Sequence, residues 1–191
     1  MLPKWSKSML SNDVLYLQGV SPKDADLLAK WRFSDRNYDF FYEFLPTTKE
    51  QNEKWIESVL NKKNEINLIA YEKESGRPVG TISLIDIDSR NQKCEIGRVL
   101  IGNEDDRKKG YGMHLISLVL EYAFLHLNMR KVYLEVFAEN ASAVRFYEKS
   151  GFKEDGLFKE HIYKNGKFKD VVHMSLFKTD FLASASTKGN G

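Results

Sequence analysis

The sequence predicts a mixed α+β domain built around one central sheet. Short segments such as VLYLQ (14–18) alternate apolar and polar residues as strands do, and longer segments carry apolar residues at helical spacing. Neighbouring strand segments are joined mostly by short turns, and one strand–helix–strand crossover surrounds the longest helix segment. We therefore expect a mixed, mostly antiparallel twisted sheet of about seven strands flanked by four helices.

Two helices are predicted after the first strand (14–18). Ser21 and Pro22 form a typical helix start, with the hydroxyl as cap and proline in the first turn. Thr48 caps a second helix that ends near Lys62. The residues expected to face inward are Ala25, Leu27, Leu28 and Trp31 in the first helix, and Trp55, Ile56, Val59 and Leu60 in the second.

The remainder of the chain supplies the other strands and helices. Asn165 and Gly166 lie between the last two strands, and an Asn-Gly pair favours a type I′ hairpin turn. Strands are expected at 66–71, 78–86, 93–101, 132–137, 153–163 and 167–178, and helices at 110–127 and 141–150. Residues 1–182 are expected to form a single domain, and residues 183–191 a flexible C-terminal tail.

Composition excludes several classes of protein. The 191 residues carry a formal net charge of +2, which does not suggest nucleic acid as a partner. A single cysteine, Cys94, rules out a disulfide framework and a cysteine-rich zinc site, and the four histidines show no metal-ligand spacing. No apolar stretch reaches the roughly 18 residues of a membrane span, and the N-terminus lacks the apolar core of a signal peptide. We expect a cytoplasmic protein without a metal, a membrane partner or a nucleic-acid partner.

The stretch DDRKKGYGMH (105–114) is the first candidate for a ligand site. It follows a predicted strand and opens the longest predicted helix, whose first N–H groups lack partners within the helix. Gly110 and Gly112 would let a phosphate approach those amides, and three neighbouring cations would add countercharge. The spacing matches neither a P-loop nor a three-glycine dinucleotide motif. A solvated helix start is the alternative interpretation.

Three segments resemble the GNAT superfamily of acetyl-coenzyme A-dependent N-acetyltransferases. R-x-x-G-x-G at Arg107, Gly110 and Gly112 is similar to the family's pyrophosphate-binding motif. ENASAVRFYEKSGF (139–152) resembles its N-x-x-[AS]-x-x-x-Y-x-x-x-G-F segment, and EIGRVLIG (95–102) resembles the strand before the phosphate loop. The resemblance covers roughly residues 12 to 180, and within the family it is greatest to enzymes that acetylate ribosomal-protein N-termini, spermidine and nucleotide-linked amino sugars. The connection from Gly102 to Asp106 is longer and more acidic than the family's usual short turn.

The resemblance implies a binding site for acetyl-coenzyme A as cosubstrate. Main-chain groups of Leu100 and Ile101 would pair with pantetheine, amides of the 107–113 segment would hold the pyrophosphate, and Asn140 would hydrogen-bond pantetheine. The implied contacts are Leu100, Ile101, Arg107, Lys108, Lys109, Gly110, Tyr111, Gly112, Met113, Asn140, Ala143, Phe146 and Tyr147.

Two residues receive catalytic roles. By the resemblance, Tyr147 returns a proton to the departing thiolate, although a tyrosine packed on the core is the alternative. Glu95 is the first candidate for the base that takes the proton of the attacking amine, with His161 and His173 as weaker candidates. A purely structural strand-face carboxylate is an equally open interpretation of Glu95.

The aromatic segment NYDFFYEFLPTT (37–48) is the candidate acceptor site. In the family this segment lines the acceptor pocket, and here Tyr38, Asp39, Phe41 and Glu43 combine rings with carboxylates that suit a cationic amine. We expect acetyl transfer to a small-molecule primary amine by direct attack in a ternary complex, with a nucleotide-linked amino sugar favoured. A peptide N-terminus, a polyamine, or a non-catalytic acyl-coenzyme A sensor are the alternatives. A homodimer is compatible with the resemblance.

Overall fold

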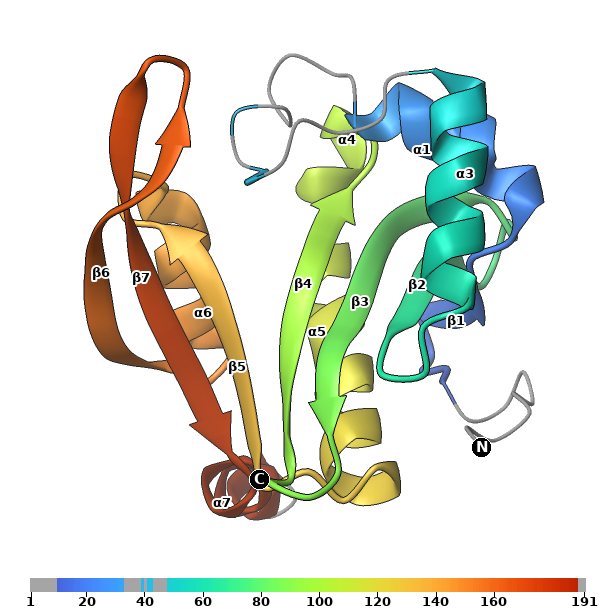
Figure 1. Ribbon diagram of the computed structural model, residues 1–191. Helices are drawn as coiled ribbons and strands as arrows, with labels where there is room; N and C mark the ends of the chain where they lie inside the picture. The colour runs from blue at the N-terminus through green and yellow to red at the C-terminus, as the bar shows by residue number, and fades with distance from the viewer. Residues whose placement is uncertain (1–9, 33–38, 40, 43–47, 189–191) are drawn as a thin grey trace. The chain divides into compact units, whose positions relative to one another are not determined.

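The computed structural model describes residues 10–32, 39, 41–42 and 48–188, with side chains described as far as residue 184 (Figure 1). The sheet is seven-stranded, in the order β1-β2-β3-β4-β5-β7-β6. β4 pairs with β5 in parallel, whereas β1 with β2, β2 with β3, β5 with β7 and β6 with β7 pair antiparallel. The mostly antiparallel mixed sheet predicted from the sequence is confirmed. The strands are β1 (Leu15–Gly19), β2 (Ile66–Glu72), β3 (Pro78–Asp88), β4 (Lys93–Ile101), β5 (Lys131–Phe137), β6 (Lys153–Lys164) and β7 (Lys167–Phe177).

The described residues contain more helices than the four predicted. A short 3-10 turn, η1 (Pro22–Asp24), precedes α1, and a π-helical turn, η2 (Tyr122–His126), follows α5. The α-helices are α1 (Ala25–Arg32), α3 (Lys49–Leu60), α4 (Glu104–Arg107), α5 (Tyr111–Glu121), α6 (Ala141–Lys149) and α7 (Lys178–Lys188). α4 and α7 were not predicted. α7 includes residues 183–188, which the sequence analysis placed in a flexible C-terminal tail, and the flexibility of that tail stays a prediction.

The chain divides into two compact units. Unit 1 comprises Met1–Ile85 and Gly97–Val119, and unit 2 comprises Asp86–Ile96 and Leu120–Gly191. The chain passes from one unit to the other within β3, within β4 and within α5. Each unit has its own buried core.

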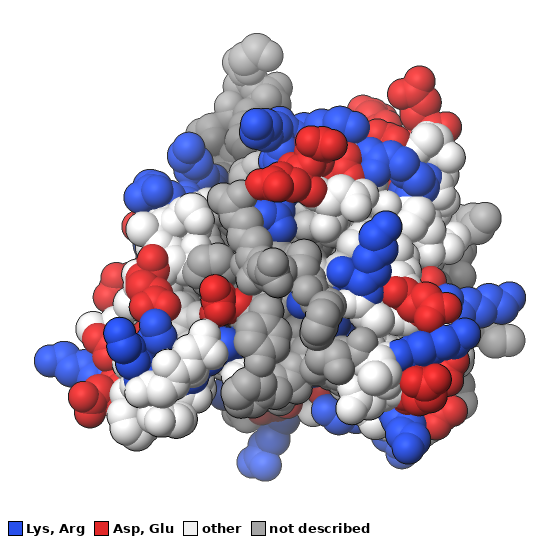
Figure 2. All heavy atoms as spheres, turned by 90° about the horizontal axis from the view of Figure 1, so that it is seen from above, with Lys and Arg blue, Asp and Glu red and all other residues white. Residues whose placement is uncertain are grey.

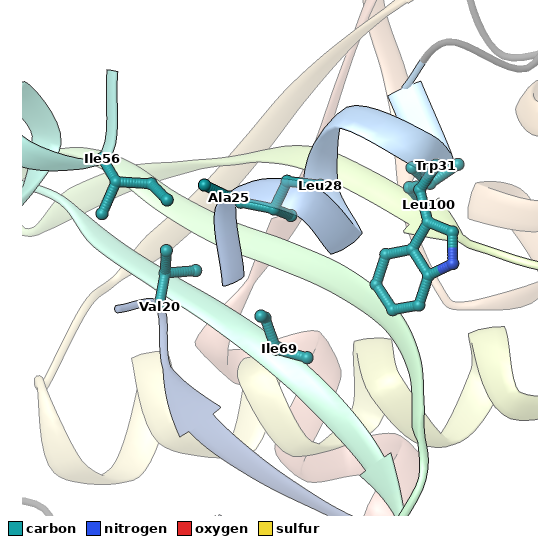
Figure 3. Close-up of a cluster of buried hydrophobic side chains, with 7 residues drawn as sticks. All are labelled: Val20, Ala25, Leu28, Trp31, Ile56, Ile69 and Leu100. Carbon is teal, nitrogen blue, oxygen red and sulfur yellow. The ribbon is translucent and has the colours of Figure 1, made fainter. Parts of the chain in front are cut away.

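The core of unit 1 gathers side chains from α1, α3, β2 and β4 (Figure 3). Leu28, Trp31 and Ile56 are at most 3% exposed, and they cluster with Ile69 and Leu100. The inward-facing residues predicted for α1 are confirmed, with Leu27 partly buried. Burial of this apolar surface removes it from water and fixes both helices on the strands.

The prediction that Leu60 of α3 faces inward was wrong. Leu60 is 54% exposed, although Ile56 and Val59 are buried and Trp55 is partly buried. Leu60 is the last residue of the helix, and Asn52, which is fully buried, completes the inward stripe in its place. The apolar pattern alone did not identify a polar residue as part of the core.

Both helix caps predicted in unit 1 are present. The Thr48 hydroxyl oxygen accepts from the Gln51 N–H at 3.2 Å, and the Gln51 side chain accepts from the Thr48 N–H at 3.1 Å. At the start of η1, the Asp24 carboxylate accepts from the Ser21 N–H at 2.8 Å and from its hydroxyl at 2.9 Å. These reciprocal bonds supply partners for groups that a helix start leaves unpaired.

Unit 2 is organised on β5, which lies between β4 and β7. Cys94 in β4 is opposite Val132 in β5, and both are fully buried. Burial, with a smaller contribution from the charge of Glu95, raises the pKa of the Cys94 thiol to about 12. The predicted I′ hairpin turn agrees with the structure, because Asn165 has φ +52° and Gly166 φ +76°.

The long helix changes geometry where a continuous α-helix to Leu127 was predicted. α5 ends at Glu121, and the Leu127 N–H then bonds the Tyr122 carbonyl at 3.0 Å, five residues back. Tyr122, Ala123 and Phe124 are nonetheless buried, so the apolar face continues through the π-turn. The hydrophobic pattern predicted the buried face and missed the change in winding.

Candidate active site

The segment between β4 and α5 brings the predicted phosphate-binding residues of unit 1 together. After α4 the chain reaches Gly110, whose φ of +77° lies in the left-handed region that favours glycine. α5 starts at the next residue, Tyr111, and the Met113 N–H bonds the Gly110 carbonyl at 3.0 Å. A Cβ added at Gly110 would meet no atom within 4 Å. The glycine therefore sets the turn that starts the helix, and the space beside it is open to a ligand.

The three cations of this segment differ in their surroundings. The Lys109 ammonium lies 3.3 Å from an oxygen of Asp106 and 5.8 Å from the Tyr111 ring centroid, so its charge is already compensated within the protein. Lys108 is exposed, and Arg107 is half-buried. The three cations, which the sequence treated as equivalent, therefore differ in burial, and Lys109 also has a carboxylate and a ring close to its ammonium.

The side chain of Tyr111 is held inside unit 1. Its side chain is 4% exposed, and its hydroxyl donates a hydrogen bond to Glu72. This hydrogen bond raises the pKa of Tyr111, and hydrogen bonds from Ser75 and Tyr111 lower the pKa of Glu72. The side chain thus anchors the first residue of α5, and the N–H group remains the part able to face an anion.

β4 contains a backbone distortion that the sequence did not predict. Arg98 has φ +53° in the middle of the strand, a conformation that costs a non-glycine residue about 1 kcal/mol or more. The Arg98 carbonyl accepts a hydrogen bond from the Thr81 hydroxyl at 2.9 Å. The Arg98 guanidinium donates to Glu65 at 3.1 Å and to Asn67 at 2.9 Å. These contacts hold the strained residue two positions before Leu100, where main-chain contacts with pantetheine were predicted.

Glu65 remains charged despite its position. Burial opposes its ionisation, but hydrogen bonding to Lys62 and the charge of Arg98 outweigh burial and lower the pKa of the carboxyl. The Arg98 guanidinium also lies 5.4 Å from the centroid of the Trp55 ring. Nothing in EIGRVLIG (95–102) signals this arrangement, because a left-handed arginine has no sequence signature.

In unit 2, α6 carries the second group of predicted coenzyme A contacts. Asn140 caps the helix, its side-chain oxygen accepting from the Ala143 N–H at 3.2 Å and from the Ser142 hydroxyl at 2.9 Å. The structure therefore gives Asn140 and Ala143 a role in starting α6. Their predicted contact with pantetheine stays a prediction.

Tyr147 is packed among aromatic rings of unit 2. Its ring lies edge-on to Phe146, with centroids 5.2 Å apart, and to Phe152 at 5.9 Å. The residue is half-buried, and burial raises the pKa of its hydroxyl above the ordinary value for tyrosine. No described residue forms a hydrogen bond with that hydroxyl. Tyr147 is therefore protonated near neutral pH, as a proton donor must be.

Two of the three candidate bases of unit 2, Glu95 and His173, neighbour Tyr133. Glu95 in β4 is directly opposite Tyr133 in β5, and it is half-buried. Burial, followed by the charges of Glu95, Asp86 and other groups, raises the pKa of Tyr133 to about 12. The His173 ring stacks on Tyr133 with centroids 5.3 Å apart. The carboxylates of Glu95 and Asp86 therefore contribute negative charge near Tyr133, where the Lys93 ammonium also lies 5.9 Å from the ring centroid.

The two histidines differ in how firmly they are held. His173 Nδ1 lies 3.4 Å from a carboxylate oxygen of Asp155, and 19% of its side chain is exposed. His161 is exposed and contacts Phe158, with ring centroids 5.1 Å apart. Of the two, His173 has the carboxylate neighbour that orients an imidazole.

The predicted acceptor segment is only partly described. Tyr38 and Glu43 lie outside the described residues. Asp39 is exposed in a turn, and Phe41 packs against the core cluster of unit 1. Phe41 therefore has a packing role whether or not it also contacts an acceptor.

The described part of the face in Figure 2 carries acidic and basic side chains interspersed, in keeping with the net charge of +2. Among the described residues there is no group of three or more His, Cys, Asp or Glu side chains that could hold a metal ion. None of the described helices is both long and apolar enough to span a membrane.

Two curated proteins resemble part of this chain in sequence. The spermidine N(1)-acetyltransferase of Vibrio cholerae is 36% identical over 104 residues, which make up 54% of this chain and 59% of that protein. The enzyme of the same name from Escherichia coli is 30% identical over 114 residues, 60% of each protein. These alignments thus span about 60% of the length of both curated relatives.

Solved structures match over a larger share of the chain. The crystal structure of spermidine N-acetyltransferase from Vibrio cholerae in complex with CoA and spermine has a TM-score of 0.81 and 25% identity, covering 90% of this chain and 99% of that one. The family model for the acetyltransferase (GNAT) domain matches residues 17–173, a range that contains both the 107–113 turn and α6. The chain therefore belongs to the GNAT acetyltransferase domain family.

Proposed function

We propose that this protein is an acetyl-coenzyme A-dependent N-acetyltransferase whose acceptor is a polyamine such as spermidine or spermine. The observation that carries the proposal is the left-handed Gly110 within R-x-x-G-x-G, which starts α5 beside open space. A helix N-terminus presents unpaired N–H groups and a positive dipole end, which together suit a pyrophosphate. Membership of the GNAT family supports coenzyme A as its source.

The choice of acceptor rests on the relatives and on the charge of unit 2. The rings and carboxylates of the 37–48 segment favoured a nucleotide-linked amino sugar, with a polyamine as one alternative. Relatives named for spermidine acetylation now favour the polyamine. Burial, followed by the charges of Glu95 and Asp86, raises the pKa of Tyr133, and carboxylates near this ring suit a polycationic acceptor.

The proposed mechanism uses general acid–base catalysis by residues of this chain. Glu95 accepts the proton that the acceptor ammonium must lose before its nitrogen attacks the acetyl carbonyl. A main-chain N–H near Leu100 hydrogen-bonds the oxyanion that forms on that carbonyl. As the carbon–sulfur bond breaks, Tyr147 donates its proton to the thiolate and the attacking nitrogen releases its second proton to solvent. Solvent then reprotonates Tyr147 and takes the proton from Glu95. The packing of Tyr147 keeps its hydroxyl protonated until that step.

Thiol release from acetyl-coenzyme A tests both parts of the proposal. Spermidine, spermine, a nucleotide-linked amino sugar and a short peptide with a free N-terminus are compared at equal concentration, and the acetylated product is identified by mass spectrometry. We expect the polyamines to give the highest kcat/KM. A higher value for the sugar or the peptide would overturn the choice of acceptor but leave the enzyme class intact. Coenzyme A binding without turnover of any amine would indicate a non-catalytic acyl-coenzyme A sensor.

A further inference from the structure

The acidic connection before Gly110 contains one deeply buried carboxylate, Asp106. Only 2% of this residue is exposed, although it lies in the charged sequence EDDR of α4. A buried carboxylate is costly unless each oxygen has a hydrogen-bond partner of opposite charge or polarity. Here the two terminal nitrogens of Arg77 donate to the two oxygens of Asp106, at 2.7 Å and 2.6 Å. This two-point geometry is the strongest form of an arginine–carboxylate pair.

Further contacts link this pair to both sides of Gly110. The side-chain amide of Asn103 donates to Asp106 at 3.1 Å, and the Lys109 ammonium lies 3.3 Å from the same carboxylate. On the other side of Arg77, its Nε donates to Glu72 at 3.2 Å, and Glu72 also accepts from the Tyr111 hydroxyl. The turn between β2 and β3 is thereby tied to the residues immediately before and after Gly110.

The charges in this cluster have a direct bearing on anion binding. The two carboxylates, Glu72 and Asp106, are balanced by Arg77 and Lys109. Without Arg77, Asp106 would keep a negative charge beneath the segment proposed to bind a pyrophosphate. Truncating one partner of a buried ion pair is strongly destabilising, since it leaves the other charge uncompensated. Arg77 therefore both fixes the segment and cancels a charge that would repel the ligand.

We propose that Arg77 and Asp106 are positioning residues that hold the 107–113 segment in the conformation that binds the pyrophosphate of coenzyme A. The proposal rests on the proposed function, since it assigns a role to residues of that same site. Neither residue needs to touch the cosubstrate. The sequence departure noted above, a longer and more acidic connection, is then accounted for: Asp106 anchors the connection to a distant arginine, 29 positions earlier in the chain.

The test compares two acetyl donors that differ in the phosphate-bearing part. Acetyl-coenzyme A contains the pyrophosphate, and S-acetylpantetheine lacks it. For Arg77→Gln we expect kcat/KM with acetyl-coenzyme A to fall about tenfold or more through KM, because small displacements of a binding segment have effects of this size. For the same variant, kcat/KM with S-acetylpantetheine and kcat at saturating acetyl-coenzyme A should both stay within about twofold of the wild-type values. A proportionate loss with both donors, or no loss with either, would overturn the proposal.

Three further variants separate charge from geometry and from folding. Arg77→Lys keeps the charge and loses the two-point contact, so its loss should be smaller than that of Arg77→Gln. Arg77→Gln combined with Asp106→Asn leaves no uncompensated carboxylate and should regain part of the binding, which keeps the test valid if the single variant folds poorly. Lys153→Gln, which breaks an exposed ion pair with Asp180 (2.9 Å) in unit 2, serves as the matched control and should behave as the wild type.

The variant Gly110→Val distinguishes failure of this inference from failure of the proposed function. If Gly110→Val removes the preference for acetyl-coenzyme A over S-acetylpantetheine and Arg77→Gln does not, the phosphate site stands and the positioning role of Arg77 is wrong. If the wild type neither binds coenzyme A nor prefers the full donor, the proposed function and this inference fail together.

Discussion

Tyr147 keeps its proton to high pH because it packs against Phe146 and Phe152 in partly buried surroundings. Raising the pKa of a phenol makes it a weaker acid but also ensures that the acid form predominates near neutral pH. An ordinary thiol has a pKa of about 8.5, so proton transfer from Tyr147 to the departing thiolate is uphill and must be coupled to breaking of the carbon–sulfur bond. The packing of a single ring thus decides whether this residue is ready to donate.

The variant Tyr147→Phe retains the ring packing and removes the proton. We expect kcat to fall about 100-fold or more, the usual contribution of a positioned general acid, while the Kd of coenzyme A changes little. Stopped-flow thiol release and calorimetric titration measure the two quantities. In the wild type, the alkaline limb assigned to Tyr147 should lie above pH 10, because burial raises the pKa of this tyrosine.

Tyr163→Phe is the matched control for that variant. Tyr163 is 62% exposed in β6, and its ring contacts Phe168, so the same atom is removed at an unrelated position. We expect wild-type kinetics for this control. An equal loss of kcat in both variants would contradict the assignment of Tyr147 as the acid.

Gly110→Ala tests the conformational requirement at the start of α5. An alanine at φ +77° costs roughly 1–2 kcal/mol, although its Cβ meets no neighbouring atom. We expect a loss of about this size in the free energy of unfolding, together with weaker coenzyme A binding. Urea unfolding and calorimetry provide the measurements. If the free energy of unfolding and the affinity for coenzyme A were both unchanged, a left-handed residue would not be required at position 110.

At the scale of elements, the end of β4 is held by close contact with α1. A Cβ added at Gly102 would lie 2.1 Å from the Trp31 ring, which is itself part of the core of unit 1 (Figure 3). Gly80 in β3 is equally restricted, since its Cβ would lie 2.4 Å from the Leu100 carbonyl oxygen. These glycines permit the approach of neighbouring elements around the strand that precedes the phosphate segment.

Gly102→Ala should therefore disturb the packing of α1 on β4. We expect a loss of about 1–3 kcal/mol in the free energy of unfolding, the usual cost of overpacking a core. Gly19→Ala is the control, because a Cβ at Gly19 meets no atom within 4 Å, and it should change stability by no more than about 0.5 kcal/mol. Urea titrations followed by circular dichroism compare the two, and similar small effects would show that Trp31 can move aside.

The elements that sequence predicted well are those defined by local patterns. Alternation located the strands, helical spacing located α1, α3, α5 and α6, and the caps at Ser21 and Thr48 follow from residue type. α4 and α7 were missed because one is a single charged turn and the other has little apolar periodicity. The π-turn after Glu121 was missed because its buried residues keep a helical pattern. Local patterns indicate which face of an element is buried, but they contain little information on the backbone geometry of that element.

At the scale of the whole molecule, paired carboxylates should determine the acid limit of stability. Hydrogen bonding to Arg77 lowers the pKa of Asp106. For Asp155 and Glu65, burial opposes ionisation, but hydrogen bonds from their lysine partners outweigh it and lower the pKa of both carboxyls. A carboxyl whose pKa is lower in the folded state contributes stability above its unfolded pKa, about 4, and that contribution is lost as the pH falls through the folded value.

Urea unfolding of the wild type should thus give a nearly constant free energy from pH 6 to 8 and a falling one below about pH 4. Asp106→Asn should be less stable than the wild type at pH 7, and the gap should narrow as the pH falls below about 4, because the unfolded wild type then binds a proton at Asp106 while the folded protein keeps the charge. A gap that stays constant across this range would show that the Asp106 charge does not stabilise the fold.

The candidate site was predictable where it depends on motifs and unpredictable where it depends on distant contacts. R-x-x-G-x-G located the turn at Gly110, and the segment around Tyr147 located α6. The left-handed Arg98 and the pairing of Arg77 with Asp106 have no local signature, since each depends on residues brought together by folding. The relatives, and not the residues of the 37–48 segment, favoured a polyamine over an amino sugar.

Labelling of the Cys94 thiol can measure how often the folded protein opens locally. It is the only cysteine of the chain, it is fully buried, and its thiol ionises only at a pH near 12. A disulfide reagent in solution should modify it only during the moments when β4 separates from β5, so the rate of labelling measures how often unit 2 opens under native conditions. Because Cys94 is protected, the folded enzyme does not react with the colorimetric thiol reagent that measures free coenzyme A. Every thiol detected at early times therefore comes from turnover.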